Sequence, residues 1–286
     1  MLFATVMFWG IGFPISKLGV DYIPPFTFAF LRFFITSIIF SIIMIKKYNL
    51  KVKTLTDNFL ILSIMGISGI TAYNFFYLYS LKLTLVSNSA LIAAFNPIIT
   101  TIIASIVLKE KINNFMWIGI ILSFFGVLLI ISHGSIAIVQ HLSFNKGDMF
   151  MFIATSLWAA YSVSAKIAMK RLDFFTAVGL STILGTIYLI PFVLFDPGSK
   201  NIFSYPLVSW FSVFYMSIVA TFFAFTMWYK GIERFGASKT SIFVNLVPVF
   251  GVIASSLMLN EKIEPITLMG GGMVIVGVVI TNRMKT

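Results

Sequence analysis

The 286-residue chain contains no cysteine and very little charge. The absence of cysteine excludes disulfides, thiolate catalysis and cysteine-based metal sites. Only 10% of the residues are charged, against about 25% in an average soluble domain, and 59% are hydrophobic. This composition predicts a membrane protein.

Long runs with almost no charge recur along the chain, and a helix needs about 20 apolar residues to cross a bilayer. The runs are apolar throughout and do not alternate as the strands of a membrane barrel do. The sequence therefore predicts an all-α polytopic membrane protein with ten transmembrane helices. We expect the spans at 2–22, 25–45, 58–80, 86–108, 114–132, 148–169, 174–195, 207–229, 238–259 and 265–281.

Acidic residues are scarce, and none of the nine Asp and Glu residues falls in the middle of a predicted span. The chain has no HExxH motif, and its two histidines, His133 and His141, lie in or near one predicted outer loop. These absences argue against an intramembrane enzyme, and we expect no metal and no cofactor. No loop is long enough for the soluble domain of a sensor, and nothing resembles a repeated selectivity filter.

The basic residues of the predicted loops are distributed unequally. With a cytoplasmic N-terminus, twelve lie on the inner side and four on the outer side. By the positive-inside rule, this distribution predicts an inner-membrane protein with both termini in the cytoplasm. The net charge of +11 then requires no nucleic acid, because the segment "KKYNLKVK" is explained as a topological anchor at the lipid surface.

The chain is two copies of one unit. Shifting the sequence by 149 residues superposes Trp9 on Trp158 and Lys17 on Lys166; at 151, "EKI" at 110–112 superposes on "EKI" at 261–263. Since each copy contains five helices, an odd number, the second must insert upside down relative to the first. We expect repeats at 1–132 and 148–286, joined by an outer loop at 133–147.

Several motifs resemble those of the EamA-type transporters of the drug/metabolite transporter superfamily. They are W-G-x-x-F-x-x-x-K from Trp9 to Lys17, "LRF" at 31–33, a mid-helix proline in the fourth span, and L-x-E-K-I before a glycine-rich helix. The resemblance implies two inverted five-helix repeats and export of amino acids or other small metabolites. Members often carry a carboxylate before the proline, where this chain has Asn96 and Val247, which argues against carboxylate-based proton coupling.

Three cations fall inside predicted spans, where charge is costly and commonly functional. Lys17 shares a helical stripe with Trp9 and either lines a pathway or pairs with Asp21. Lys166 either lines the opposite mouth or snorkels to the headgroups. Arg32 lies roughly 10 Å into its helix and either binds carbonyls freed at a kink or holds an anionic substrate group.

Polar and aromatic residues of the same spans complete the set of pathway candidates. Asn96 and Asn245 lie close to prolines and either satisfy freed carbonyls or face a cavity. Trp228 and Tyr229 precede Lys230 and are interpreted as interface-belt residues. The remaining candidates are Tyr73, Asn74, Tyr77, Trp158, Tyr161 and Ser162 for the substrate pathway, and Pro14, Pro97 and Pro248 as hinges.

Glycines recur at seven-residue spacing in the fifth and tenth spans, at Gly119 and Gly126 and at Gly270 and Gly277. Seven residues return to the same helix face, so these glycines allow close helix packing, within one chain or across a homodimer. The paired "EKI" segments are expected to cap helix ends.

These features predict a secondary transporter that binds a small-molecule substrate and exports amino acids or related metabolites by alternating access. Intramembrane cations without carboxylates favour solutes that carry an anionic group. Transport or exchange of other organic anions or phosphorylated metabolites is the alternative, and an intramembrane enzyme or sensor is the remote one.

Overall fold

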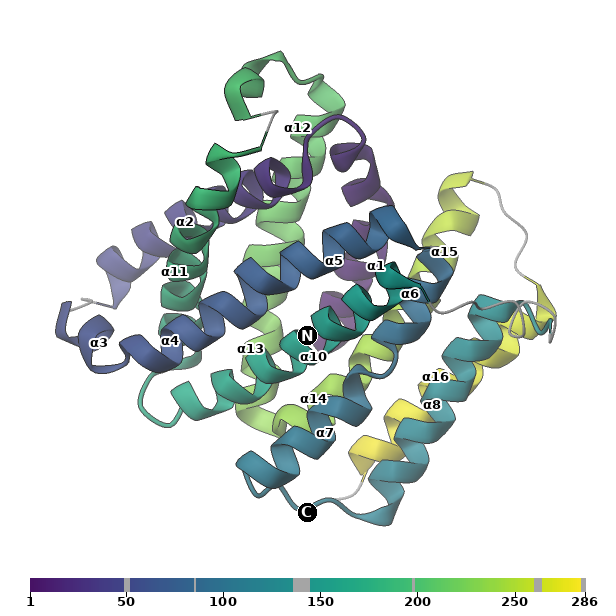
Figure 1. Cartoon of the computed structure of the whole chain (residues 1–286). Coiled ribbons are helices and arrows are strands. Elements are labelled where there is room, and N and C mark those ends of the chain that lie inside the picture. Colours follow the sequence, from purple (N-terminus) through teal and green to yellow (C-terminus); the bar gives the residue numbers. More distant parts are fainter. Residues whose placement is uncertain (49–51, 85, 136–144, 197–198, 260–263, 284–286) are drawn as a thin grey trace.

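The computed structural model describes residues 1–48, 52–84, 86–135, 145–196, 199–259 and 264–283, and the described regular structure is helical (Figure 1). Ten helices are long and apolar enough to span a membrane, which confirms the number and order of the predicted spans. They are Leu2–Val20, Pro25–Lys47, Phe59–Ser80, Ser89–Val107, Asn114–Ser132, Lys146–Ala168, Phe174–Leu194, Leu207–Phe235, Ala237–Ala254 and Pro265–Asn282.

The first repeat contains five spans and one short surface helix. Its elements are α1 (Leu2–Val20), α2 (Pro25–Lys47), α3 (Val52–Asp57), α4 (Phe59–Gly66), η1 (Ile67–Thr71), α5 (Ala72–Leu83), α6 (Val86–Ala93), α7 (Asn96–Val107) and α8 (Asn114–Ser132). The third span is continuous from α4 through η1 to α5. The fourth consists of α6 and α7, which are separated by the turn that precedes Pro97.

The second repeat has the same order of spans. Its elements are α10 (Lys146–Ala168), α11 (Phe174–Leu194), η2 (Ser199–Ser204), α12 (Leu207–Phe214), η3 (Tyr215–Phe223), α13 (Ala224–Phe235), α14 (Ala237–Ser241), η4 (Ile242–Leu246), α15 (Val247–Leu259) and α16 (Pro265–Arg283). The eighth span comprises α12, η3 and α13, while the ninth comprises α14, the 3₁₀ turn η4 and α15.

Side chains that accept hydrogen bonds from free backbone N–H groups define several helix starts. Asn113 accepts from the N–H of Met116 at the start of α8, and Asp173 accepts from the N–H of Thr176 at the start of α11. Asn145 and Asp148 form a reciprocal capping box at the start of α10. Each cap begins a span close to where the sequence predicts it.

The two repeats pack as inverted copies. The first span of each repeat crosses the third and fourth spans of the other: α10 packs on α5 and α7, and α1 packs on α13 and α15. The second spans, α2 and α11, pack together, and α8 and α16 form a separate pair at one edge of the bundle (Figure 1). This exchange of partners places the first and third spans of both repeats at the centre.

Both third spans contain a π-helical segment, η1 in one repeat and η3 in the other. Thr71 and Thr221 lie 150 residues apart in these segments. The Thr221 hydroxyl donates to the carbonyl five residues earlier, that of Met216, at 2.7 Å. The Thr71 hydroxyl lies 3.4 Å from the equivalent carbonyl of Gly66 and 3.0 Å from that of Gly185 in α11. A π-helical turn displaces backbone carbonyls from the regular ladder and makes them available to other donors.

The glycine faces of α8 and α16 meet within one chain. A Cβ atom at Gly126 would lie 2.6 Å from the carbonyl oxygen of Gly270, and one at Gly270 would lie 2.7 Å from that of Gly126. These faces are therefore occupied by intramolecular packing. A homodimer through the fifth and tenth spans stays a prediction, and it would have to use their outer faces, which expose Phe125 and Ile275 among others.

The repeats are packed more closely at one end of the bundle than at the other. We name the end where α1 begins and α16 ends the terminus side. There α14 packs on α7 and on α10. Among the described residues, the pairs that symmetry makes equivalent at the other end, α6 with α15 and α1 with α6, have no comparable packing. The structure is therefore closed on the terminus side.

Candidate functional site

Trp9 and Trp158, which the repeat makes equivalent, meet at the centre of the bundle. Their ring centroids lie 5.5 Å apart in an edge-to-face arrangement. The indole N–H of Trp9 donates to the carbonyl of Ala220 at 2.9 Å, within the π-helical segment η3. The two first spans thus contact each other through their tryptophans, and Trp9 is held by a carbonyl of the π-helical segment.

A cluster of seven aromatic side chains surrounds this contact, and we name it the aromatic cluster. Its members are Trp9, Tyr73, Trp158, Tyr161, Phe225, Trp228 and Tyr229, from α1, α5, α10 and α13.

The interpretation of Trp228 and Tyr229 as interface-belt residues is wrong. Both are fully buried. Trp228 lies 5.0 Å from Trp9, and Tyr229 lies 5.0 Å from Tyr161. Although Lys230 follows them along the chain, α13 turns the ring of Trp228 toward Trp9 of the first repeat and that of Tyr229 toward Tyr161 of its own repeat.

Arg32 in α2 reaches the same π-helical segment. Its Nε–H donates to the hydroxyl of Thr221 at 2.6 Å, and its guanidinium carbon lies 4.8 Å from the ring centre of Phe33. Among the described residues, the two terminal nitrogens of the guanidinium have no hydrogen-bond partner. In the described part of the chain, Arg32 thus binds a threonine hydroxyl of η3 and not the freed carbonyls of the first alternative, while the donors of the forked end remain for a ligand.

Tyr73 and Tyr77 lie one turn apart on α5, and both interact electrostatically with Arg32. Their rings stack with centroids 5.5 Å apart, and Tyr73 also lies 5.2 Å from Trp158. Asn74 points elsewhere, because its amide donates to the carbonyl of Ile70 at 2.7 Å within its own helix. The aromatic cluster and Arg32 are thus joined through Tyr73.

The two asparagines near the prolines are buried, and each binds a neighbouring span. The amide of Asn96 donates to the carbonyl of Thr155 in α10 at 3.3 Å, and that of Asn245 donates to the hydroxyl of Ser123 in α8 at 3.0 Å. The helix is interrupted just before Pro97 and becomes 3₁₀ just before Pro248. Pro14, in contrast, lies on the exposed face of an uninterrupted α1.

The lysines of the repeated stripe are described to different extents. Lys166 contacts the end of α13: its ammonium donates to the carbonyls of Ile232 at 3.0 Å and Glu233 at 2.7 Å. Ser162, one turn earlier, is buried. Lys17 lies in α1, but its side chain is outside the part of the structure that is described, so its pairing with Asp21 stays a prediction.

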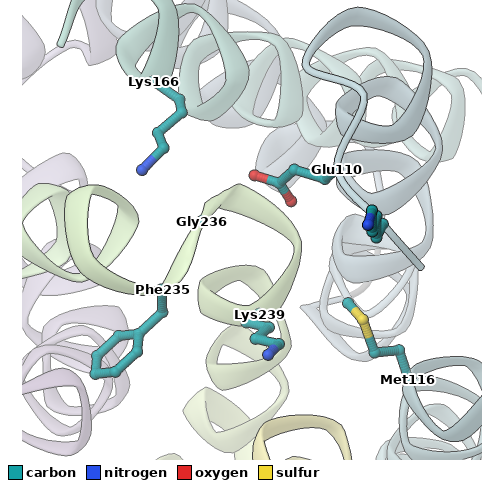
Figure 2. A pocket seen from close by; sticks show the side chains of 7 residues that line it. Glu110, Met116, Lys166, Phe235, Gly236 and Lys239 are labelled. Carbon is teal, nitrogen blue, oxygen red and sulfur yellow. The ribbon is translucent and has the colours of Figure 1, made fainter. Parts of the chain in front are cut away.

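Glu110 joins the two repeats on the terminus side. One carboxylate oxygen accepts from the N–H of Ala237 at 2.9 Å; the other accepts from the N–H and hydroxyl of Ser238 at 3.1 and 2.6 Å. The first "EKI" segment therefore caps a helix, α14, as predicted; the second, at 261–263, lies outside the described residues. Figure 2 shows Glu110 and Lys166 on either side of Gly236.

Several residues of this centre have only weak signals in the sequence. Phe225 is one phenylalanine among 32 in the chain, and Thr221 is an ordinary small residue in an apolar run. A pairwise comparison of the repeats would have found Thr221, because Thr71 occupies the equivalent position. The sequence predicts that Glu110 caps a helix end, but which helix it caps in the other repeat follows only from the three-dimensional packing.

Ten membrane-spanning helices in two inverted repeats, with their first spans in contact at the centre, define an integral membrane transporter. The model of the EamA-like transporter family matches residues 1–132 and 145–283. The chain belongs to this family, within the drug/metabolite transporter superfamily, which confirms the resemblance of its motifs. It is a transporter and not an enzyme.

Similar proteins support the assignment over the full length. The chain is 32% identical to the uncharacterized transporter YyaM of Bacillus subtilis, covering 99% of this chain and 92% of that protein. It is 23% identical to a probable amino-acid metabolite efflux pump of Salmonella typhimurium, covering 96% and 91%. A solved crystal structure that is 17% identical superposes with a TM-score of 0.81 over 99% of this chain and 95% of the other, which supports the fold.

Proposed function

We propose that this transporter exports amino acids or related small metabolites that carry an anionic group. The observation that carries the proposal is Arg32, a half-buried guanidinium within a membrane span. A cation in hydrocarbon is costly without a counter-charge. Its Nε–H binds Thr221, and its forked end lacks a partner among the described residues. A planar guanidinium is suited to bind a carboxylate through two parallel hydrogen bonds.

The aromatic cluster would bind the part of the solute that lies away from its anionic group. Tyr73 interacts electrostatically with Arg32, and the ring of Trp158 lies 5.2 Å from that of Tyr73. Aromatic rings with a polar edge bind the apolar part of an amphipathic molecule and offer hydrogen bonds to its polar groups. A carboxylate beside an apolar side chain, as in many amino acids, matches this arrangement.

Transport would proceed by alternating access between the inverted repeats. The repeats are closed on the terminus side and less closely packed on the other, as one of two symmetry-related states would be. No Asp or Glu lies in the middle of a span. Facilitated diffusion or exchange therefore suits the chain as well as proton coupling does.

A counterflow screen tests the proposal. Purified protein in liposomes would be loaded with single amino acids, organic acids or phosphorylated metabolites, with and without a pH gradient. We expect saturable exchange of solutes that carry an anionic group and none of organic cations. Exchange restricted to phosphorylated metabolites would favour the second candidate, which Arg32 also suits; no exchange of any anion would refute the proposal.

A further inference from the structure

The indole N–H groups of the two central tryptophans differ in their hydrogen bonding. That of Trp9 donates to the carbonyl of Ala220 at 2.9 Å. That of Trp158 has no hydrogen-bond partner among the described residues, although its ring packs against Tyr73 and Phe225. Because buried indole N–H groups usually have a partner, a difference between two residues that the repeat makes equivalent requires a cause.

Asn74 accounts for the difference. The offset of 150 residues between the two π-helical segments pairs Ile70 with Ala220 and Asn74 with Ala224. By this symmetry, the acceptor expected for Trp158 is the carbonyl of Ile70. That carbonyl accepts instead from the amide of Asn74 at 2.7 Å. Ala224 has no amide, so the carbonyl of Ala220 remains available to the other tryptophan.

Trp158 is partly accessible at the centre of the bundle. It retains 8% of its surface exposed, whereas Trp228 of the same cluster has none. The indole nitrogen of Trp228 also lacks a partner among the described residues, but it is fully enclosed by the protein. Of these two indoles, Trp158 is therefore the one that a solute can contact.

The indole donor of Trp158 is separate from the anion-binding group. Arg32 interacts electrostatically with Tyr73, whose ring lies 5.2 Å from that of Trp158. Among the described residues, no hydrogen bond or ring contact joins the guanidinium to Trp158. A solute whose anionic group binds Arg32 would therefore meet Trp158 with another part of the molecule. An indole N–H only donates, so that part must carry an acceptor.

We propose that Trp158 selects solutes by donating its indole N–H to an oxygen outside the anionic group, such as a hydroxyl or amide oxygen. Asn74 is the positioning residue, because its amide occupies the backbone carbonyl that Trp158 would otherwise bind. Trp9 keeps the structural bond of its copy. The inference rests on the proposed function, in which Arg32 orients the solute.

Solvent exchange of the indole protons tests the free donor without any solute. The five tryptophans would be labelled with ¹⁵N, and the protein in nanodiscs transferred to D₂O. Single Trp→Phe substitutions assign the indole resonances. We expect the N–H of Trp158 to exchange at least about tenfold faster than the hydrogen-bonded N–H of Trp9. Equal protection of the two would overturn the proposal.

Asn74→Ala tests the positioning role. The carbonyl of Ile70 would lose its amide donor and could accept from Trp158, so we expect exchange at Trp158 to slow toward the rate of Trp9. Asn282→Ala is the matched control, because the Asn282 amide also donates to the carbonyl four residues earlier, at 3.0 Å, but in α16. Equal exchange rates of Trp158 in the two variants would contradict the role of Asn74.

Two pairs of amino acids of similar shape test the selection itself: threonine with valine, and asparagine with leucine. The first of each pair has an acceptor oxygen where the second has a methyl group. In counterflow, we expect KM to be about tenfold lower for the first, because a site built around a hydrogen bond discriminates against an analogue that lacks the acceptor. Trp158→Phe keeps an aromatic ring without the N–H and should remove this preference.

Trp117→Phe is the control for the loss of a tryptophan. Trp117 lies near the start of α8 and does not belong to the aromatic cluster, so the preference should persist in this variant. A preference that also persists in Trp158→Phe would refute this inference alone, as would counterflow of other solutes with none of these four. No counterflow of any solute would refute the proposed function, and the inference with it.

Discussion

Arg32 is bound to Thr221 through its Nε–H, while its forked end has no hydrogen-bond partner among the described residues. Substitutions at Arg32 therefore test whether that end binds the solute. Arg32→Lys keeps the positive charge but loses the forked donors, so we expect KM for an anionic solute to rise about tenfold. Arg32→Gln removes the charge and should abolish transport. Counterflow in liposomes, corrected for the amount of inserted protein, measures both effects.

Arg171 supplies the matched control for this prediction. It is exposed at the turn between α10 and α11, and Arg171→Gln should transport as the unaltered protein does. If Arg32→Gln transported with normal KM, the guanidinium would have only its structural role at Thr221.

At the scale of the elements, the Glu110 carboxylate connects the first repeat to the start of α14 by accepting hydrogen bonds from it. In Glu110→Gln, one carboxylate oxygen is replaced by an NH₂ group, which faces an N–H instead of accepting from it. We expect the terminus side to open more often. Spin labels at Val107→Cys and Arg234→Cys, exposed positions at the ends of α7 and α13, should show an added population at longer distance.

Glu264→Gln is the corresponding control on the opposite side. Glu264 contacts His133 at 3.2 Å between the fifth and tenth spans, and both side chains are exposed. Its loss should leave the label distances unchanged. Identical distance distributions in Glu110→Gln and in the unaltered protein would contradict the role of Glu110 in closing the terminus side.

Two glycines of the triplet in α16 allow a matched test of how closely α16 must pack on α8. At Gly270, a Cβ atom would approach the carbonyl oxygen of Gly126 and force α8 and α16 apart, while at Gly272 nothing lies within 4 Å. We expect Gly270→Ala to destabilise the pair by about 1–3 kcal/mol and Gly272→Ala to have no such effect. Thermal denaturation in detergent measures the difference; equal midpoints would show that α8 and α16 do not require the close approach.

Prediction from sequence succeeds where the signal is local and fails where it depends on the other repeat. Hydropathy places the spans, and the spacing of matched residues predicts the inversion, because both depend only on order along the chain. The sequence predicts an interface position for Trp228 because Lys230 follows it, whereas packing against Trp9 sets the direction of the ring. The π-helical segments have no residue signature in an apolar run, so they appear only in the structure.

At the scale of the whole molecule, orientation in the membrane remains a prediction based on the loop charges. Tyr48→Cys and Phe203→Cys are exposed positions on opposite sides of the bundle. A membrane-impermeant thiol reagent applied to intact cells should label position 203 and leave position 48 unlabelled until the membrane is opened. Labelling of position 48 from outside would reverse the proposed cytoplasmic placement of both termini.

The shared π-helical segments also indicate how the gene arose. A π-helical turn corresponds to one extra residue in a helix, and η1 and η3 occur at equivalent places in the two repeats. One insertion before the duplication explains both more simply than two independent insertions after it. The ancestral product would then have been a five-span protein that already contained this turn and paired with an inverted copy of itself. Such a protein would have entered the membrane in both directions, so its loops would have lacked the charge imbalance from which the orientation of the fused chain is predicted.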